Sequence, residues 1–236
     1  MKKSVPPFEH LKRDKKLAKI IDHVGEVKLK KRSDLYLHLL RAIVAQQLST
    51  QAADTIWGRF IDLFEDQHPA PKPLLLMEPE KIRGAGLSYQ KTGYLKNIAQ
   101  FSMDKTLEYS KLKNKTDEEL IEYLTEIKGV GRWTVEMILM FSLGRPDIMP
   151  VDDLGIQTAM KSLYRIDLEG KLLKEKMLKL SEKWRPHRTV ACVYLWRWKD
   201  SQRKSEKNIE EGLVPKAKRR TISRYLSPCF EETDRL

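Results

Sequence analysis

The sequence predicts an all-α fold. Apolar residues recur at helical spacing along most of the 236-residue chain, and we find no sustained alternation of period two, which marks half-buried strands. Glycine and proline interrupt these apolar patterns at intervals that suit helices of ordinary length. A chain of this length can bury a sizeable core in one or two closely packed domains.

The first expected helices lie before residue 104. Apolar spacing predicts one helix over 35–48 and another over 56–64. A short helix that begins near Glu78 is ended by the glycines at positions 84 and 86. A longer helix follows from about Tyr89 to Met103, again on apolar spacing.

Local signals bound the later helices more sharply. Thr116 and Glu119 form a capping box that opens a helix. After a glycine-rich turn, the apolar spacing continues until Gly144 and Pro146 break it, and Pro150 precedes the next helix start. The expected ranges are 116–126, a helix ending near 143, a helix from 153 onward, 171–183 and 186–199.

The charge of the chain favours a nucleic-acid partner. Lysine and arginine total 45 against 33 acids, which gives a formal charge of +12. Cys192 and Cys229 form no CxxC pair and no disulfide framework, so a reducing interior is expected. No apolar run reaches membrane-spanning length and no hydrophobic signal segment is found. We expect no membrane partner, and a location in the cytoplasm (at a bacterial nucleoid) or in a nucleus.

The composition changes near Lys199. From there to Arg220 the chain is strongly charged and poor in apolar residues, and it ends in the basic cluster Lys216, Lys218, Arg219 and Arg220. We expect residues 199–236 to form a tail that is either mobile or in part a short helix. Contact with DNA and a solvated tail without a role both remain open.

The glycine-rich turn is the most informative segment. Gly129 and Gly131 lie in the stretch Ile127-Lys-Gly-Val-Gly-Arg-Trp-Thr134, between two expected helices. Glycine allows a tight turn and a close approach to its backbone, and bare amides at a helix start attract phosphate. The paired carboxylates Asp152 and Asp153 follow downstream. The pattern indicates an enzyme that holds nucleic acid and acts on it.

This stretch, together with the proline-linked loop Met149–Ile156, resembles the helix–hairpin–helix base-excision DNA glycosylase superfamily. The resemblance includes Ala42–Ser49 and Trp184–Trp196 and spans roughly Leu35 to Trp198. The chain is most similar to the 3-methyladenine DNA glycosylase II branch in its compact form. The resemblance implies a glycosylase domain at 1–198, with the hairpin at 116–143 and a catalytic loop at 144–156. It also implies two packed helical subdomains with the active-site cleft between them.

The resemblance assigns the catalytic acid. In the superfamily, the catalytic aspartate stands three residues before an apolar residue of the next helix. Asp153 and Ile156 have that spacing, and Asp152 does not. We therefore expect Asp153 to be catalytic, with Asp152 as the helix cap or as a group beside the catalytic acid.

The resemblance also places residues around the base. Trp133 occupies the position where strand-cutting relatives carry a Schiff-base lysine, which implies a monofunctional enzyme whose indole lines the base pocket. Met137 and His187 stand where the best-studied bacterial pattern has tyrosine and tryptophan, which implies a narrower substrate range. We expect His187 to be neutral while it lines the pocket. Gln46 and Gln47 lie either beside the pocket or on a helix surface.

Further residues are expected to contact the DNA. The backbone amides at Gly129 and Gly131 are implied to hold a phosphate. Tyr89 is the expected wedge that fills the space left by the flipped base, with Leu87 as a rival and core packing as the alternative for both. Thr134 is a further expected DNA contact. The charged residues Arg132, Lys91 and Arg188 are expected to contact phosphates, and each of them is alternatively an ordinary solvated residue.

The implied function is base excision by a monofunctional glycosylase. Such an enzyme flips an alkylated purine out of duplex DNA and hydrolyses the N-glycosidic bond; the implied substrate is 3-methyladenine, with 7-methylguanine as a second candidate. No redox cofactor and no catalytic metal are expected, although the backbone carbonyls of Thr125, Ile127 and Val130 are implied to hold a structural Na⁺ or K⁺ ion. We expect a monomer. The alternatives are a glycosylase for another lesion and a non-catalytic DNA-binding protein.

Overall fold

The computed structural model describes residues 6–27 and 34–210, with side chains described to residue 202, and those residues form helices and loops without a strand. The all-α prediction is therefore confirmed. The chain divides into two compact units. In the described part, unit 1 comprises residues 6–27 and 145–210, and unit 2 comprises residues 34–144.

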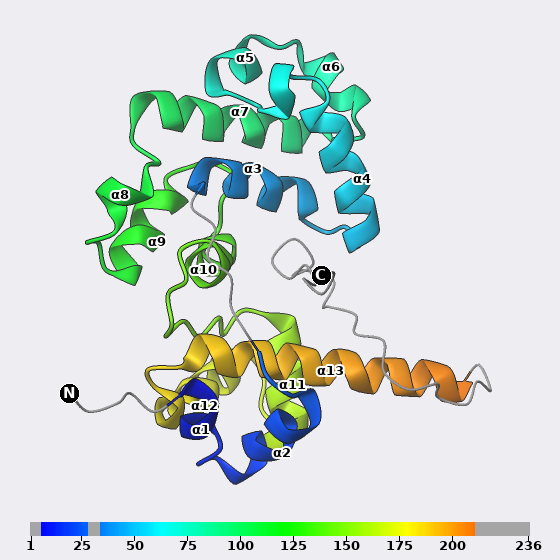
Figure 1. The fold of residues 1–236 in the computed structure, drawn as a ribbon, viewed down its shortest axis with the longest axis vertical. Coiled ribbons are helices and arrows are strands. Elements are labelled where there is room, and N and C mark those ends of the chain that lie inside the picture. Colours follow the sequence, from blue (N-terminus) through cyan, green and yellow to red (C-terminus); the bar gives the residue numbers. More distant parts are fainter. Residues whose placement is uncertain (1–5, 28–33, 211–236) are drawn as a thin grey trace, which may run out of the picture. The chain divides into compact units, whose positions relative to one another are not determined.

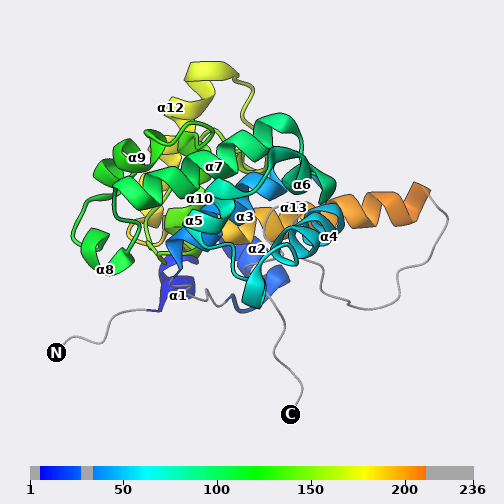
Figure 2. The same cartoon turned by 90° about the horizontal axis from the view of Figure 1, so that it is seen from above.

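Unit 2 is built around one long helix. Helix α7 lies along α3 and also packs against α5 (Figures 1 and 2). Its core is aliphatic, and Leu40, Ile43, Leu95 and Leu139 are all fully buried. The helices of this unit are α3 (Leu35–Ala45), α4 (Thr50–Ile61), η1 (Glu65–Gln67), α5 (Pro71–Leu76), α6 (Pro79–Gly84), α7 (Tyr89–Asp104), α8 (Tyr109–Leu112), α9 (Asp117–Thr125) and α10 (Arg132–Phe141).

Unit 1 is organised by its last helix. Helix α13 packs against both α2 and α11, and it continues beyond them in Figure 1. The segment before it contains the cis peptide bond between Arg185 and Pro186. The helices of this unit are α1 (Pro7–Leu11), α2 (Lys15–Val24), α11 (Leu154–Tyr164), α12 (Gly170–Ser181), η2 (Glu182–Trp184) and α13 (Arg188–Glu210).

A buried carboxylate joins three segments of unit 1. Asp14, the N-cap of α2, is 6% exposed. It accepts hydrogen bonds from Trp184 Nε1 at 3.0 Å and from the Tyr164 hydroxyl, and Lys183 Nζ lies 2.9 Å away. Burial by itself raises the pKa of Asp14, but these donors, with the amide of Lys16, outweigh it and lower the pKa to about 2. The ionised carboxylate therefore holds α2 against the end of α11 and η2.

The helix predicted over 186–199 was too short. Helix α13 runs to Glu210, because lysine, arginine, glutamine and glutamate are good helix formers and the first following glycine is Gly212. The expected boundary at Lys199 therefore falls inside α13, and the expected tail from residue 211 onward lies outside the described residues. The basic cluster at 216–220 lies outside the described residues. Helices α1 and α2 were not predicted, although Asp14 is a local capping signal for α2.

Candidate functional site

The glycine turn forms a hairpin between two helices of unit 2. Helix α9 opens with the predicted capping box of Thr116 and Glu119, and α10 begins immediately after Gly131, its N-cap. The amide of Val130 donates to the carbonyl of Ile127 at 2.9 Å. Gly129 has a φ of 104°, a conformation that side chains disfavour, so this position needs glycine.

Helix α7 and the end of α3 hold this hairpin from outside. The ring of Tyr94 lies so close to Gly129 that a Cβ atom there would be 2.2 Å from its Cγ. Asn97 Nδ2 donates to the carbonyl of Lys128 at 3.1 Å, and Gln46 Nε2 lies 3.5 Å from the carbonyl of Gly129. The turn is therefore fixed before any ligand arrives. The carbonyls of Thr125, Ile127 and Val130 belong to this turn, and the cation that they are expected to hold stays a prediction.

The first turn of α10 combines a buried residue with a charged one. Thr134 is 4% exposed and packs in the interior. Arg132 pairs through two nitrogens with Glu118, at 2.7 and 2.9 Å, and its Nε lies 3.2 Å from Glu136. These acids hold the pKa of the Arg132 guanidinium above its usual range. A phosphate at Arg132 would compete with Glu118 for the guanidinium. DNA contact by Arg132 or by Thr134 therefore stays a prediction.

Two half-buried apolar side chains share one face of α10. Trp133 and Met137 are four residues apart, so their side chains are neighbours on the helix surface. Both are of intermediate exposure, whereas Val135, Ile138 and Leu139 beside them are buried. These two side chains are therefore partly accessible on α10, and their place in a base pocket stays a prediction.

The two aspartates of the catalytic loop have different surroundings. Asp153 is 6% exposed and is the N-cap of α11: its Oδ1 accepts the amide of Ile156 at 2.7 Å and the indole Nε1 of Trp196 at 2.8 Å. Asp152 is exposed and pairs with Lys174. The expectation that Asp152 caps the helix was wrong, because the carboxylate that is expected to be catalytic is itself the cap.

Close packing surrounds Asp153. A Cβ atom on Gly155 would lie 2.9 Å from Oδ1 of Asp153 and 3.0 Å from Nε1 of Trp196. Neither Gly155 nor Trp196 was expected to have a role at the site. Gly155 did carry a signal, since a glycine in the first turn of a helix weakens that helix and indicates a close approach.

Lys91 supports a helix end. Its Nζ donates to the carbonyls of Val44 and Gln46, at 2.8 and 2.7 Å, and its burial lowers its pKa. A cation at the carboxyl end of α3 satisfies carbonyls that have no helical partner. This engagement argues against a direct phosphate contact by Lys91. Gln47 follows this helix end, exposed and with a φ of 59°.

The two wedge candidates are separated by their burial. Leu87 is 5% exposed and belongs to the core of unit 2, which agrees with the core packing that was the alternative to a wedge role for this residue. Tyr89 begins α7 and is 62% exposed. Its hydroxyl is bonded to Glu80, and the guanidinium of Arg83 lies 4.0 Å from its ring centroid. Only the tyrosine of this pair is accessible to DNA in the described chain.

The start of α13 also differs from expectation. Arg188 is 9% exposed and binds both the carboxylate and the carbonyl of Asp147, at 2.7 Å each, so it braces a loop and is poorly placed for a phosphate. His187 is half-buried, with its ring 5.3 Å from that of His10. Burial and the nearby His10 lower the pKa of His187, which favours the neutral form that we expected.

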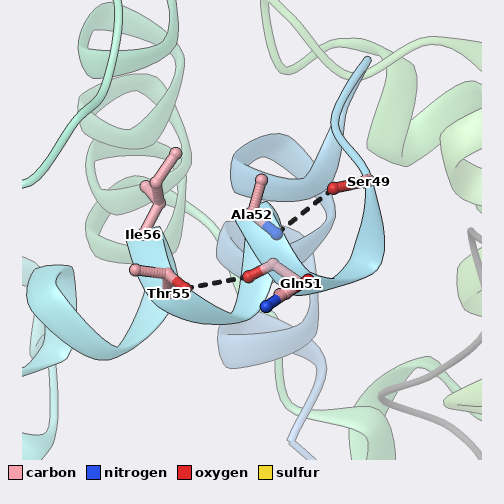
Figure 3. A pocket seen from close by; sticks show the side chains of 5 residues that line it. All are labelled: Ser49, Gln51, Ala52, Thr55 and Ile56. Atoms are coloured by element: carbon pink, nitrogen blue, oxygen red, sulfur yellow. Dashed lines mark hydrogen bonds between the residues drawn. The ribbon is translucent and has the colours of Figure 1, made fainter.

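Unit 2 also has a shallow pocket at the start of α4 (Figure 3). It has a volume of about 380 Å³ and is lined by Ser49, Gln51, Ala52, Thr55 and Ile56. In Figure 3 the Ser49 hydroxyl caps the helix by accepting the amide of Ala52, at 3.3 Å. A Cβ atom on Gly86 would lie 3.2 Å from Ile56, so the loop before Tyr89 packs directly beside this pocket.

The expected site residues are thus distributed over both units. The hairpin, Trp133, Met137 and Tyr89 come from unit 2, whereas Asp153 and His187 come from unit 1. Their assembly into one cleft stays a prediction. Among the described residues, no helix is both long and apolar enough to cross a membrane.

Comparison with known proteins identifies the pattern. Residues 40–186 match the family described as HhH-GPD superfamily base excision DNA repair protein. The chain is 40% identical over 188 residues to DNA-3-methyladenine glycosylase 1 of Schizosaccharomyces pombe, covering 78% of this chain and 80% of that protein.

Solved structures agree with this match. The 3-methyladenine DNA glycosylase of Schizosaccharomyces pombe in complex with abasic DNA has a TM-score of 0.73 and 36% identity, covering 81% of this chain and 95% of that one. The DNA-3-methyladenine glycosidase of Bacillus halodurans has a TM-score of 0.71 and 34% identity, covering 85% and 92%. Both comparisons extend over most of each chain.

Proposed function

The chain belongs to the HhH-GPD superfamily of base excision DNA repair proteins, and we propose that it is a DNA glycosylase that removes alkylated purines from duplex DNA. The names of its relatives support this function, since 3-methyladenine glycosylases are among the similar sequences and structures. The abasic DNA bound by the Schizosaccharomyces pombe enzyme supports DNA as the partner. The basic excess of the chain agrees with such a partner.

The observation that carries the proposal is the carboxylate of Asp153. It is nearly buried at a helix start, and two donors fix one of its oxygens. Cleavage of an N-glycosidic bond builds positive charge on the deoxyribose, which a carboxylate in a low-dielectric site stabilises. The purine leaves with the electron pair of the C1′–N bond. Water adds to C1′ and gives a proton to Asp153, which acts as the general base.

The substrate class follows from the leaving group and the pocket. Alkylation at N3 or N7 places a positive charge on the purine, so the base leaves without an acid. Trp133 would cover that base, since an indole face attracts a cation by about 1–2 kcal/mol when desolvated. Met137 and His187 would complete the pocket, and a neutral His187 would not repel a cationic base. The substrates that we propose are 3-methyladenine and 7-methylguanine.

Trp133 also supports a monofunctional enzyme. Strand cutting through a Schiff base needs an amine at the sugar. Trp133, in the position where the resemblance puts that lysine, has no amine to give. The enzyme would therefore release the base and leave an abasic site. This hydrolysis needs only water and a carboxylate, and we propose no redox cofactor or catalytic metal for it.

The hairpin would hold the DNA backbone. The amides around Gly129 and Gly131 lie at the start of α10, where the helix dipole favours a phosphate. A Na⁺ or K⁺ ion on the carbonyls of Thr125, Ile127 and Val130 would add positive field there as a structural ion. We further propose that the protein acts as a monomer, at a bacterial nucleoid or in a nucleus.

Release of free base from methylated duplex DNA tests the proposal. The wild-type protein should release 3-methyladenine. The variant Asp153→Asn should still bind the DNA but should release no 3-methyladenine, because asparagine still caps the helix but cannot accept the proton. Binding without release by the wild-type protein would indicate a non-catalytic DNA-binding protein. Release of a different base from a mixed substrate would identify a glycosylase for another lesion, with the same type of reaction.

A further inference from the structure

We propose that Trp196 and Gly155 are positioning residues for the catalytic carboxylate, an inference that rests on the proposed function. Trp196 lies on α13 and is 5% exposed, and Gly155 lies in the first turn of α11. These two helices of unit 1 pack against each other. The indole therefore connects a second helix to the carboxylate on the first.

Both donors act on the same oxygen of Asp153. The amide of Ile156 comes from the helix that Asp153 caps, 2.7 Å away, and the indole N–H of Trp196 comes from 43 residues later in the chain, 2.8 Å away. A cap bond alone leaves the plane of a carboxylate free to turn. A second donor from another helix fixes that plane, so the other oxygen takes one position relative to the helix axis. Stabilising a sugar cation and orienting water both need such a fixed oxygen.

The glycine makes this arrangement possible. Any side chain at Gly155 would press on Oδ1 of Asp153 and on the indole ring of Trp196, at 2.9 and 3.0 Å. The ring is buried and cannot move away cheaply. Glycine here therefore allows the backbone of α11 to approach the pair closely, at the cost of helix propensity.

The protein contains a matched control for this inference. Trp184 is also buried in unit 1 and donates its indole N–H to a carboxylate, Asp14, at 3.0 Å. A buried indole N–H needs an acceptor in any case, so a structural role alone would make the two pairs equivalent. Asp14 has no part in the proposed chemistry. Trp184→Phe thus removes the same kind of indole–carboxylate bond without touching the proposed catalytic group, while Asp14 keeps its contacts with Tyr164 and Lys183.

The test compares Trp196→Phe with Trp184→Phe, which remove the same kind of bond. The readouts are the single-turnover rate of 3-methyladenine release, the affinity for abasic DNA and the thermal midpoint. We expect both variants to be less stable. Only Trp196→Phe should slow release, by about 10- to 100-fold, with its affinity for abasic DNA within about twofold of wild type. Trp196→Gln, which restores an N–H donor, should recover part of the rate.

Gly155→Ala is the second variant and keeps every hydrogen-bonding group. It should slow release at unchanged DNA affinity, so the inference stays testable if Trp196→Phe does not fold. Wild-type release by either folded variant, or an equal loss in Trp184→Phe, would overturn the positioning role. Undiminished release by Asp153→Asn would instead overturn the proposed function, which separates the two failures.

Discussion

The ring of Tyr94 occupies the space that any side chain at Gly129 would need, since a Cβ atom there would lie 2.2 Å from Cγ of the ring. The φ of 104° at Gly129 adds a second reason for glycine. Helix α7 thus sets the shape of the hairpin turn through one aromatic contact.

Gly129→Ala should therefore distort the turn. We expect a loss of at least about 2 kcal/mol of stability, from backbone strain and overpacking together. Affinity for duplex DNA should fall by about tenfold, which corresponds to roughly 1.4 kcal/mol of phosphate contact. Chemical denaturation and fluorescence anisotropy measure the two effects. Gly93→Ala is the control: that exposed glycine of α7 has open space around it, so alanine should stabilise the helix. Unchanged DNA affinity in Gly129→Ala would contradict a role of the turn in binding.

Lys91→Met should lower stability by about 1–3 kcal/mol, because two carbonyls at the end of α3 lose their charged donor. The salt dependence of DNA binding should stay the same, whereas a lost phosphate contact would lower its slope by about one. The measurements are urea denaturation and binding titrations at several salt concentrations. Lys128→Met, at an exposed lysine of the hairpin, should leave stability within about 0.5 kcal/mol. A reduced salt slope in Lys91→Met would restore Lys91 as a phosphate contact.

Tyr89→Ala should weaken binding to abasic DNA by about 5- to 30-fold and binding to undamaged duplex much less, because a wedge stacks only where a base has left. Tyr89→Phe keeps the ring and removes the bond to Glu80, so it should bind abasic DNA like wild type. Anisotropy titrations of both variants on both DNAs give the comparison. An equal loss on the two DNAs in Tyr89→Ala would mean that Tyr89 is not the wedge.

Trp133→Ala should slow release of 3-methyladenine by about 5- to 30-fold, the equivalent of one desolvated cation–π contact. The protein should still fold, since Trp133 is only half-buried. Trp57→Ala is the matched control, because Trp57 is also half-buried in unit 2 and packs beneath Arg41, outside the proposed pocket. Release rates under single-turnover conditions should separate the two. Wild-type release by Trp133→Ala would refute its place in the pocket.

Asp14 should make stability depend on acid pH. Its pKa is about 2 in the fold against an ordinary value of 3.8, so the carboxylate contributes about 2 kcal/mol above pH 4. That contribution is lost as the pH falls from 3.8 towards 2. Asp14→Asn should be less stable than wild type at pH 7, and the difference should shrink by pH 2. Urea denaturation at both pH values tests this, and a constant difference would contradict it.

Local signals made much of the fold predictable. The capping box at Thr116 and Glu119 marked the start of α9, and the proline before Asp153 marked the start of α11, since each depends on neighbours in sequence. The length of α13 was underestimated because high charge resembles a tail, although its residues form helices well.

The side-chain roles that were missed depend on distant partners. Lys91 reaches a carbonyl 47 residues away, and Arg188 reaches Asp147 across 41 residues. A lysine or arginine in a basic chain resembles a phosphate contact until its tertiary neighbours are known. Leu87 likewise differs from Tyr89 only through packing, which spacing does not reveal.

Asp153 caps α11 and is also the proposed catalytic residue, so the start of this helix sets the position of the carboxylate. The loop before it is held separately, since Arg188 binds Asp147 and the side chains of Ile148 and Met149 are buried. Substitutions in this loop should therefore lower stability first, while α11 still begins at Asp153. A start of α11 shifted by a single residue would instead displace the proposed catalytic carboxylate itself, so release of the base should be lost even where the protein still folds.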